Sequence, residues 1–374
     1  MFFLYLSNFY GVKLYERESL IIFDEVQLFP KARAAIKYLV EDGRYDYVET
    51  GSLMTIKKNV ADIVIPSEER HMKMYPLDFE EFLWALDNDT LMDFIRLCFE
   101  EKKPMGQVLH RKTMDYFRQY LIIGGMPQAV KTYRNSHDFD QVDCVKRDIL
   151  ELYRADIIKH AEGYQMKVAQ IFDAIPAQLQ KHDTKFKFSS LKKEARFREY
   201  KDALFWLSDA MITNICYNST APNIGLKLNM HRMTLKCYMA DTGLLVTHTF
   251  QDKKYTDNEL YRAILFDKLN INEGMLMENI VAQMLRHSRP RLYFYSRSDS
   301  RNRENHMEID FLITEGKKIA PVEVKSGNYR SHSSLDKFRK HFSSAIGSSY
   351  ILYTKDVMVK DGIIHLPLYM AELL

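Results

Sequence analysis

Residues 308–327, EIDFLITEGKKIAPVEVKSG, constrain the fold and the function of this chain more than any other stretch. They predict two short strands, because two apolar runs of strand length are joined by a turn at Gly316. In the second strand, alternation places Glu323 and Lys325 on one face and two valines on the other. Asp310 of the first strand can then lie beside Glu323, so the spacing predicts two carboxylates and a lysine at one place.

This trio has the chemistry of a metal-dependent hydrolase. Two neighbouring carboxylates bind a hard divalent cation such as Mg²⁺ through oxygen, and a lysine alongside can orient or activate an attacking water. We therefore expect Asp310 and Glu323 to be metal ligands and Lys325 to be catalytic. The alternative is a solvated hairpin in which the Glu-x-Lys pattern is incidental.

The pattern resembles the PD-(D/E)XK, or restriction-endonuclease-like, superfamily. In that superfamily an acidic residue from the first helix joins the metal site. Glu278 in GMLMENIVAQMLRHS matches it, because apolar spacing over 276–285 predicts a helix just upstream. The superfamily's proline before the aspartate is absent, and Ile309 stands there. The resemblance implies an α/β domain that hydrolyses phosphodiesters with Mg²⁺, using Glu278 and the three residues named above.

The N-terminal run LIIFDE, residues 20–25, ends in two carboxylates. Buried parallel strands look like this, and ligands sit at the carboxyl ends of such strands. The run matches a Walker B motif, in which Asp24 would hold Mg²⁺ and Glu25 would polarise the attacking water. A second predicted strand ends in ETGS, whose Thr50 and Ser52 resemble a sensor that touches the γ-phosphate. A plain α/β core that ends in Asp-Glu is the alternative.

The order of motifs along the whole chain resembles a group of AAA-type ATPases of bacteria and archaea with a C-terminal restriction-endonuclease-like domain. FDEVQ and TGS are followed by YPLDFEEFL, GGMPQAV, YRADI and MADTGLL, and then by the blocks described above. The P-loop pattern G-x4-G-K-[ST] occurs nowhere in the sequence, and only 19 residues precede Leu20. Without a P-loop the β- and γ-phosphates lose their principal contacts. We therefore expect an N-terminally truncated protein with weak or absent nucleotide binding and no ATP hydrolysis of its own.

The middle of the chain predicts helices and then a winged helix. Residues 76–163 combine helical apolar spacing with acidic faces, which is typical of a helical lid. Residues 164–250 predict helices followed by paired strands, and basic residues are in local excess there. The residues that we expect to contact DNA phosphates are Lys192, Lys193, Arg196 and Arg198. The alternative is a solvated face of a domain that only packs against protein.

Composition narrows the partners and the compartment. The net charge of +3 provides no global basic field, so any surface for nucleic acid must be local. The four cysteines are scattered without zinc-binding spacing, and no apolar run approaches the ~20 residues of a membrane span. We therefore expect a cytoplasmic protein that does not bind membranes.

The predicted fold class is α/β in four parts. A partial P-loop-type parallel sheet core spans 1–75, a helical lid 76–163, a winged helix 164–250 and a PD-(D/E)XK nuclease-like α/β domain 255–374. The predicted function is DNA binding with Mg²⁺-dependent nuclease chemistry in the last part. One rival is an ATP-binding switch or partner-binding module whose P-loop is missing from this chain or supplied by a partner. The expected protein partner is an ATPase or, in a homo-oligomer, a second copy of the chain. The other rival is an inactive remnant.

Overall fold

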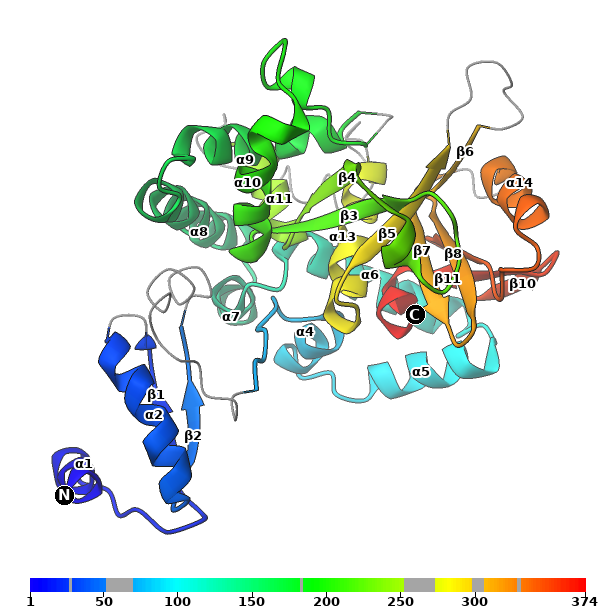
Figure 1. Ribbon diagram of the computed structural model, residues 1–374. Helices are drawn as coiled ribbons and strands as arrows, with labels where there is room; N and C mark the ends of the chain where they lie inside the picture. The colour runs from blue at the N-terminus through cyan, green and yellow to red at the C-terminus, as the bar shows by residue number, and fades with distance from the viewer. Residues whose placement is uncertain (27–28, 52–69, 182–183, 252–272, 298–305, 328–330) are drawn as a thin grey trace. The chain divides into compact units, whose positions relative to one another are not determined.

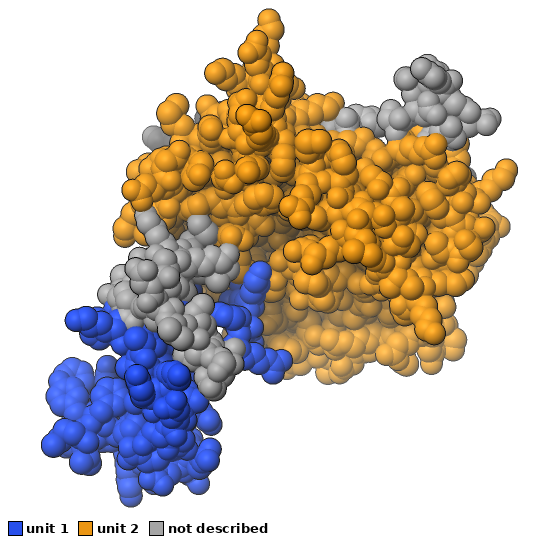
Figure 2. Space-filling view, viewed as in Figure 1, with its two compact units in different colours: residues 1–74 blue, residues 75–374 orange. Residues whose placement is uncertain are grey.

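The computed structural model spans residues 1–374 and describes all of them except 27–28, 52–69, 182–183, 252–272, 298–305 and 328–330. The chain divides into two compact units, residues 1–74 and residues 75–374 (Figure 2). Both strands and helices build each unit, and the expected α/β class is confirmed. None of the described helices is both long enough and apolar enough to cross a bilayer.

The first unit contains a parallel pair of strands connected by a helix. Its described elements are α1 (Phe2–Tyr10), β1 (Leu20–Phe23), α2 (Pro30–Asp42) and β2 (Asp46–Glu49). Pro30 at the start of α2 has the φ that a first helical turn needs, and Gly43 ends the helix in the left-handed conformation. The predicted parallel pairing is confirmed by the register Leu20↔Asp46. The burial expected of β1 is not found, because Leu20 and Ile22 are 53% and 60% exposed.

The second unit begins with a helical part. Asp78 and Glu81 form a capping box that starts the first helix, and Gly124, at a φ of 82°, ends the third. The α-helices of this unit within the described residues are α4 (Phe79–Ala85), α5 (Leu91–Glu101), α6 (Gln107–Ile123), α7 (Pro127–Ser136), α8 (Phe139–His160), α9 (Gln165–Leu179), α10 (Phe197–Asp209), α11 (Thr242–Thr249), α13 (Glu273–Ser288) and α14 (Ser333–His341). The helices expected within 76–163 and at the start of 164–250 are therefore confirmed.

A four-stranded sheet joins segments that the sequence assigned to different parts. Its order is β4-β3-β5-β6, with β3 (Thr213–Ser219), β4 (Met230–Met239), β5 (Leu292–Arg297) and β6 (Met307–Ile309). β3 pairs antiparallel with β4 and parallel with β5. The paired strands expected within 164–250 are thus confirmed, but they belong to a larger sheet (Figure 1).

Within the predicted winged helix, a short 3-10 turn at Phe188–Ser190 precedes α10, which begins at Phe197. Residues 191–196 form turns and loop. β3 is buried along nearly its whole length, as a strand between two neighbours is. A winged helix over 164–250 and the other expected domain boundaries inside residues 75–374 stay predictions.

A second, five-stranded sheet follows along the chain. Its order is β10-β11-β9-β8-β7, with β7 (Phe311–Glu315), β8 (Lys318–Val324), β9 (Tyr350–Tyr353), β10 (Met358–Lys360) and β11 (Ile363–Pro367). β8 pairs antiparallel with β7 and parallel with β9, so the sheet is mixed. The last residues, Leu368–Leu373, form a 3-10 helix.

The chain passes from one sheet to the other at Asp310. β6 ends at Ile309 and β7 begins at Phe311, so the run 308–313 is two strands in different sheets and not one continuous strand. Both sheets contribute to one hydrophobic core that α14 covers, with Ile309 from β6 and Leu312 from β7 on the sheet side and Phe338 on the helix side. This corner brings Asp310 near Glu278 of α13, which packs against β4 of one sheet and β8 of the other.

Candidate functional site

Three structural elements bring the predicted carboxylates together. Glu278 lies on α13, which packs against both β4 and β8. Asp310 lies at the corner between β6 and β7, and Glu323 lies on β8, which pairs with strands on both sides. Lys325 follows directly after β8. The sheet corner and the helix therefore place all four residues at one end of the second unit.

Asp310 is held by the backbone of the strand that carries Glu323. Its Oδ2 accepts a hydrogen bond from the amide of Val324 at 2.9 Å. Burial raises the pKa of Asp310 to about 7, and the nearby carboxylates of Glu278 and Glu323 add to this rise, while Lys236 and the amide of Val324 lower it. Its side chain is still 21% exposed, so solvent reaches the carboxyl group.

Glu323 has one satisfied and one unsatisfied oxygen. Oε1 lies 2.6 Å from Nζ of Lys325. Oε2 is buried and has no hydrogen-bond partner among the described residues. Burial raises the pKa of Glu323, although Lys325 lowers it in part. A buried carboxylate oxygen without a donor is costly unless something else occupies its coordination space.

A buried lysine that sequence reasoning missed completes the cluster. Nζ of Lys236, on β4, lies 2.7 Å from Oε1 of Glu278, 3.3 Å from Oε1 of Glu308 and 3.6 Å from Oδ1 of Asp310. Burial alone lowers the pKa of Lys236, but the carboxylates of Glu278, Asp310 and Glu308 raise it above its ordinary value. In the sequence, Lys236 could have been noticed as a lysine inside the apolar run LKCYM. Glu308 could have been noticed because it lies two residues before Asp310 in the same predicted strand.

Glu278 is the most heavily hydrogen-bonded member of the cluster. Besides Lys236, the hydroxyl of Tyr238 donates to its Oε1, as does Oγ1 of Thr184 at 3.3 Å. The next residue, Asn279, accepts from the amide of Met239 at 2.9 Å and so fixes α13 against the end of β4. The carboxylate of Glu278 is therefore positioned by β4.

The donor atoms of Asp310 and Glu323 are of the type that a hard cation prefers. Both residues offer carboxylate oxygens, and one oxygen of Glu323 is buried and unsatisfied. Among the described residues, no three His, Cys, Asp or Glu side chains are arranged closely enough to hold a metal ion. The ammonium group of Lys236 lies where three of the carboxylates converge.

The predicted nucleotide residues of the first unit lie at the carboxyl ends of its two strands. Oγ1 of Thr50 donates to Oδ1 of Asp24, and the amide of Glu25 donates to Oγ1 of Thr50 at 3.1 Å. Glu25 itself is exposed and has a φ of 53°, in the left-handed region. Ser52 lies outside the described residues. Asp24 and Thr50 are thus neighbours, as the Walker B and sensor interpretation requires.

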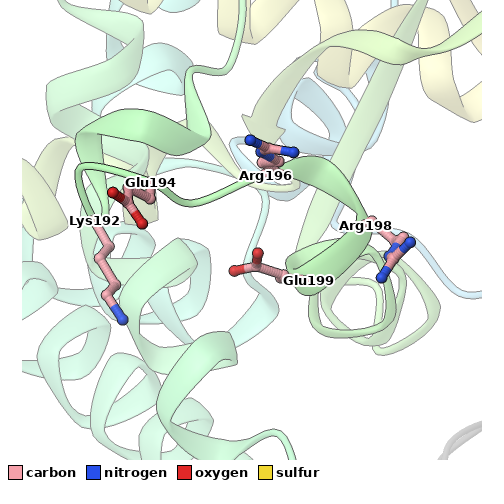
Figure 3. Close-up of a pocket in the computed structure, with 5 residues that line it drawn as sticks. All are labelled: Lys192, Glu194, Arg196, Arg198 and Glu199. Atoms are coloured by element: carbon pink, nitrogen blue, oxygen red, sulfur yellow. The ribbon is translucent and has the colours of Figure 1, made fainter.

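The predicted DNA-contacting residues are all exposed. They lie in the loop before α10 and in its first turn. Three of them, Lys192, Arg196 and Arg198, line an open pocket of about 370 Å³. Glu194 and Glu199 line the same pocket. In Figure 3 the two glutamates extend toward the middle of this pocket, whereas Lys192 and Arg198 lie on opposite sides of it. The pocket therefore carries both signs of charge.

Three family models match consecutive segments of the chain. Residues 3–83 match an AAA domain, and this segment contains the parallel strands that carry Asp24 and Thr50. The N-terminal segment is thus AAA-like. Residues 114–255 match a domain of unknown function, DUF8612, and residues 273–370 match another, DUF4143. The acidic cluster takes its carboxylates from the DUF4143 segment and Lys236 and Tyr238 from the DUF8612 segment.

One curated relative extends the comparison. The Uncharacterized protein MJ1637 of Methanocaldococcus jannaschii is 25% identical over 135 residues, which is 33% of this chain. The match spans 27% of that protein's length, about a quarter of it. No solved structure matches the chain.

Proposed function

We propose that the protein binds nucleic acid and hydrolyses phosphodiester bonds with Mg²⁺ at the site of Glu278, Asp310, Glu323 and Lys325. The observation that carries this proposal is the pairing of Asp310 with Glu323. Asp310 is bonded to the amide that follows Glu323, and Glu323 has a buried oxygen without a partner among the described residues. Two such carboxylates are the ligand type that Mg²⁺ prefers.

The residues of the site have distinct tasks in this proposal. Asp310 and Glu323 would hold the ion, since Oδ2 of Asp310 is bonded to the amide that follows Glu323. Bound Mg²⁺ supplies charge compensation for the scissile phosphate and lowers the pKa of a coordinated water. Lys325 lies 2.6 Å from Oε1 of Glu323 and would orient the attacking water. Glu278, held by three donors, keeps a further negative charge beside Asp310.

A polyanionic substrate is supported by the exposed basic residues before and within α10. Lysine and arginine side chains bind phosphates chiefly through charge and release counterions when they do so. Lys192, Arg196 and Arg198 surround one pocket and are free to reorient, because all three are exposed. The glutamates of the same pocket would disfavour a close approach of phosphate at its centre, so we place the contacts on its rim.

The decisive experiment is cleavage of fluorescent duplex, branched and single-stranded DNA by the purified full chain in Mg²⁺ or Mn²⁺. We expect cleavage that needs the divalent ion and is lost in both Asp310→Asn and Glu323→Gln. The matched control is Asp115→Asn, which removes an exposed carboxylate on α6 and should leave cleavage unchanged. Cleavage that does not need the metal ion, or cleavage that both site variants retain, would contradict the proposal.

A second candidate function is supported by the first unit. The Asp24–Thr50 pair at the ends of two parallel strands and the AAA match over 3–83 favour a nucleotide-dependent switch. The sequence given contains no P-loop pattern. A switch would therefore need a phosphate-binding loop from an ATPase partner. A chain that is inactive in both assays would be the inert remnant.

A further inference from the structure

The acidic site encloses a buried cation that belongs to another segment of the chain. The side chain of Lys236 is 1% exposed, and its Nζ lies within 3.6 Å of oxygens of Glu278, Glu308 and Asp310. On another side it lies 5.2 Å from the centroid of the Phe294 ring, at cation–π distance. Among the described residues, the ion-pair partners of this ammonium group are thus acidic residues of the site.

The three carboxylates come from three separate elements. Glu278 lies on α13, Glu308 on β6 and Asp310 at the corner that follows β6. Without a cation among them, three negative charges would repel one another in a poorly solvated place. Nζ of Lys185 also lies 3.5 Å from Oε2 of Glu308, but Lys236 is the lysine that lies among all three carboxylates, which the chain brings together only in its tertiary fold.

We propose that Lys236 is a positioning residue of the acidic site, a built-in counter-ion that holds Glu278, Glu308 and Asp310 together and opposes divalent-cation binding. The first part stands on geometry alone. The second part rests on the function proposed above, because it needs Asp310 to bind the ion. Lys236 lies within the segment 114–255 and the carboxylates within 273–370, so the site is shared between both matched segments.

The competing explanation is that Lys236 only stabilises the fold, as any buried lysine with hydrogen-bond partners does. Another buried lysine of the chain serves as the control. Lys146 is equally buried, but its Nζ donates to the backbone carbonyls of Ile122 at 2.8 Å and Gly243 at 3.2 Å. Replacing Lys146 should weaken the fold without any specific link to Glu278. Replacing Lys236 should weaken it in a way that depends on Glu278.

The first experiment is a double-mutant cycle on the full chain in a metal chelator, with urea unfolding as the readout. Lys236→Met leaves the carboxylates without their cation, and adding Glu278→Gln relieves part of the repulsion. We expect the double variant to be more stable than the two single losses predict, by about tenfold in the unfolding constant. The cycle of Lys146→Met with Glu278→Gln should be additive. Additivity in the Lys236 cycle overturns the inference.

If Lys236→Met alone does not fold, recovery of folding in the double variant with Glu278→Gln supports the inference, and a double variant that stays unfolded overturns it.

The second experiment measures how the thermal midpoints of wild type and Lys236→Met change with Mn²⁺ concentration. Removing a positive charge from beside the ligands should lower the Mn²⁺ concentration of half effect by about tenfold or more. An unchanged or higher concentration contradicts the opposition to metal. No Mn²⁺ effect in either protein, together with a coupled cycle, would instead refute the proposed metal site and retain the counter-ion.

Discussion

The backbone amide of Gly125 donates a hydrogen bond of 2.6 Å to Oδ2 of Asp241, and this bond ties the loop after α6 to the start of α11. The other oxygen of Asp241 caps α11 by accepting from the amide of Leu244 at 2.8 Å. A Cβ on Gly124 would lie 2.2 Å from that carboxylate. The carboxylate of Asp241 therefore packs closely against Gly124 and Gly125. The helix that it caps, α11, also packs against α6 and α13.

Gly243→Ala should destabilise the protein, because its Cβ would lie 2.3 Å from the carbonyl oxygen of Ile123. We expect a loss of about 1–3 kcal/mol in the free energy of unfolding. The measurement is urea unfolding, with Gly327→Ala as the control, since a Cβ at Gly327 meets nothing within 4 Å. Equal stability of the two variants would mean that α11 and α6 do not pack this closely.

Lys146 should make the stability depend on pH in the alkaline range. Burial lowers the pKa of Lys146 to about 8 from 10.5, although Asp143 and Asp241 raise it in part. Between these values the unfolded chain binds more protons than the folded chain, so this group makes stability rise with pH. We expect the stability deficit of Lys146→Met to grow above pH 8 by up to about 1.4 kcal/mol per unit. A deficit that stays constant from pH 7 to 9.5 would contradict this.

Glu323→Gln should stabilise the metal-free protein. The amide removes the cost of a buried charge, by about 1 kcal/mol, while keeping the side-chain shape. Burial holds the folded pKa of Glu323 above 4.5, so the folded state binds more protons just above that pH, and wild-type stability falls as pH rises through this window. Thermal unfolding from pH 4.5 upward should show this fall in wild type and a smaller one in the variant. The control variant Asp115→Asn removes an exposed carboxylate, and its stability should change with pH as that of wild type does.

DNA binding should depend steeply on salt. Each phosphate contact removed should lower the slope of log affinity against log salt by about 0.9. In the test variant, glutamine replaces four residues, namely Lys192, Lys193, Arg196 and Arg198. The control variant replaces four exposed basic residues elsewhere, namely Lys102, Lys103, Arg111 and Lys112. Binding that weakens equally in both variants would place the contacts somewhere other than at α10.

ATP turnover by this chain alone should not be measurable. Asp24 and Thr50 lie together, but neither they nor Glu25 provides the phosphate cradle that carries most of the catalysis. Nucleotide affinity should fall in the millimolar class, about 4 kcal/mol of binding. Turnover assays and Mg²⁺-ATP titration check this, with Glu25→Gln as the control. Turnover that Glu25→Gln abolishes would reveal a phosphate-binding loop that differs from the known pattern.

The elements with strong local signals were predictable from the sequence. Apolar periodicity located α6, α8 and α9, and it needs no knowledge of neighbours. The alternation in residues 320–325 correctly placed Glu323 beside Lys325. These features depend on residues close together in the chain.

The remaining features depend on contacts that are distant in sequence. The run 308–313 reads as one strand, but the change of sheet at Asp310 is set by pairing with β5 on one side and β8 on the other. Lys236 reads as an outlier in an apolar strand, since its three partners lie more than 40 residues away. Leu20 and Ile22 read as core, yet apolar sequence alone does not say what covers a strand.

The parallel pairing of β3 with β5 limits how this chain can be recombined. A crossover placed anywhere between Met239 and Glu273 would separate strands that are neighbours in one sheet, and it would divide Lys236 from all of its acidic partners. The C-terminal segment of this chain, moved to a host that lacks β4, would carry Glu278, Glu308 and Asp310 without the lysine that lies among them. The two segments are therefore exchangeable only as a pair, and chimeras should be joined before β3.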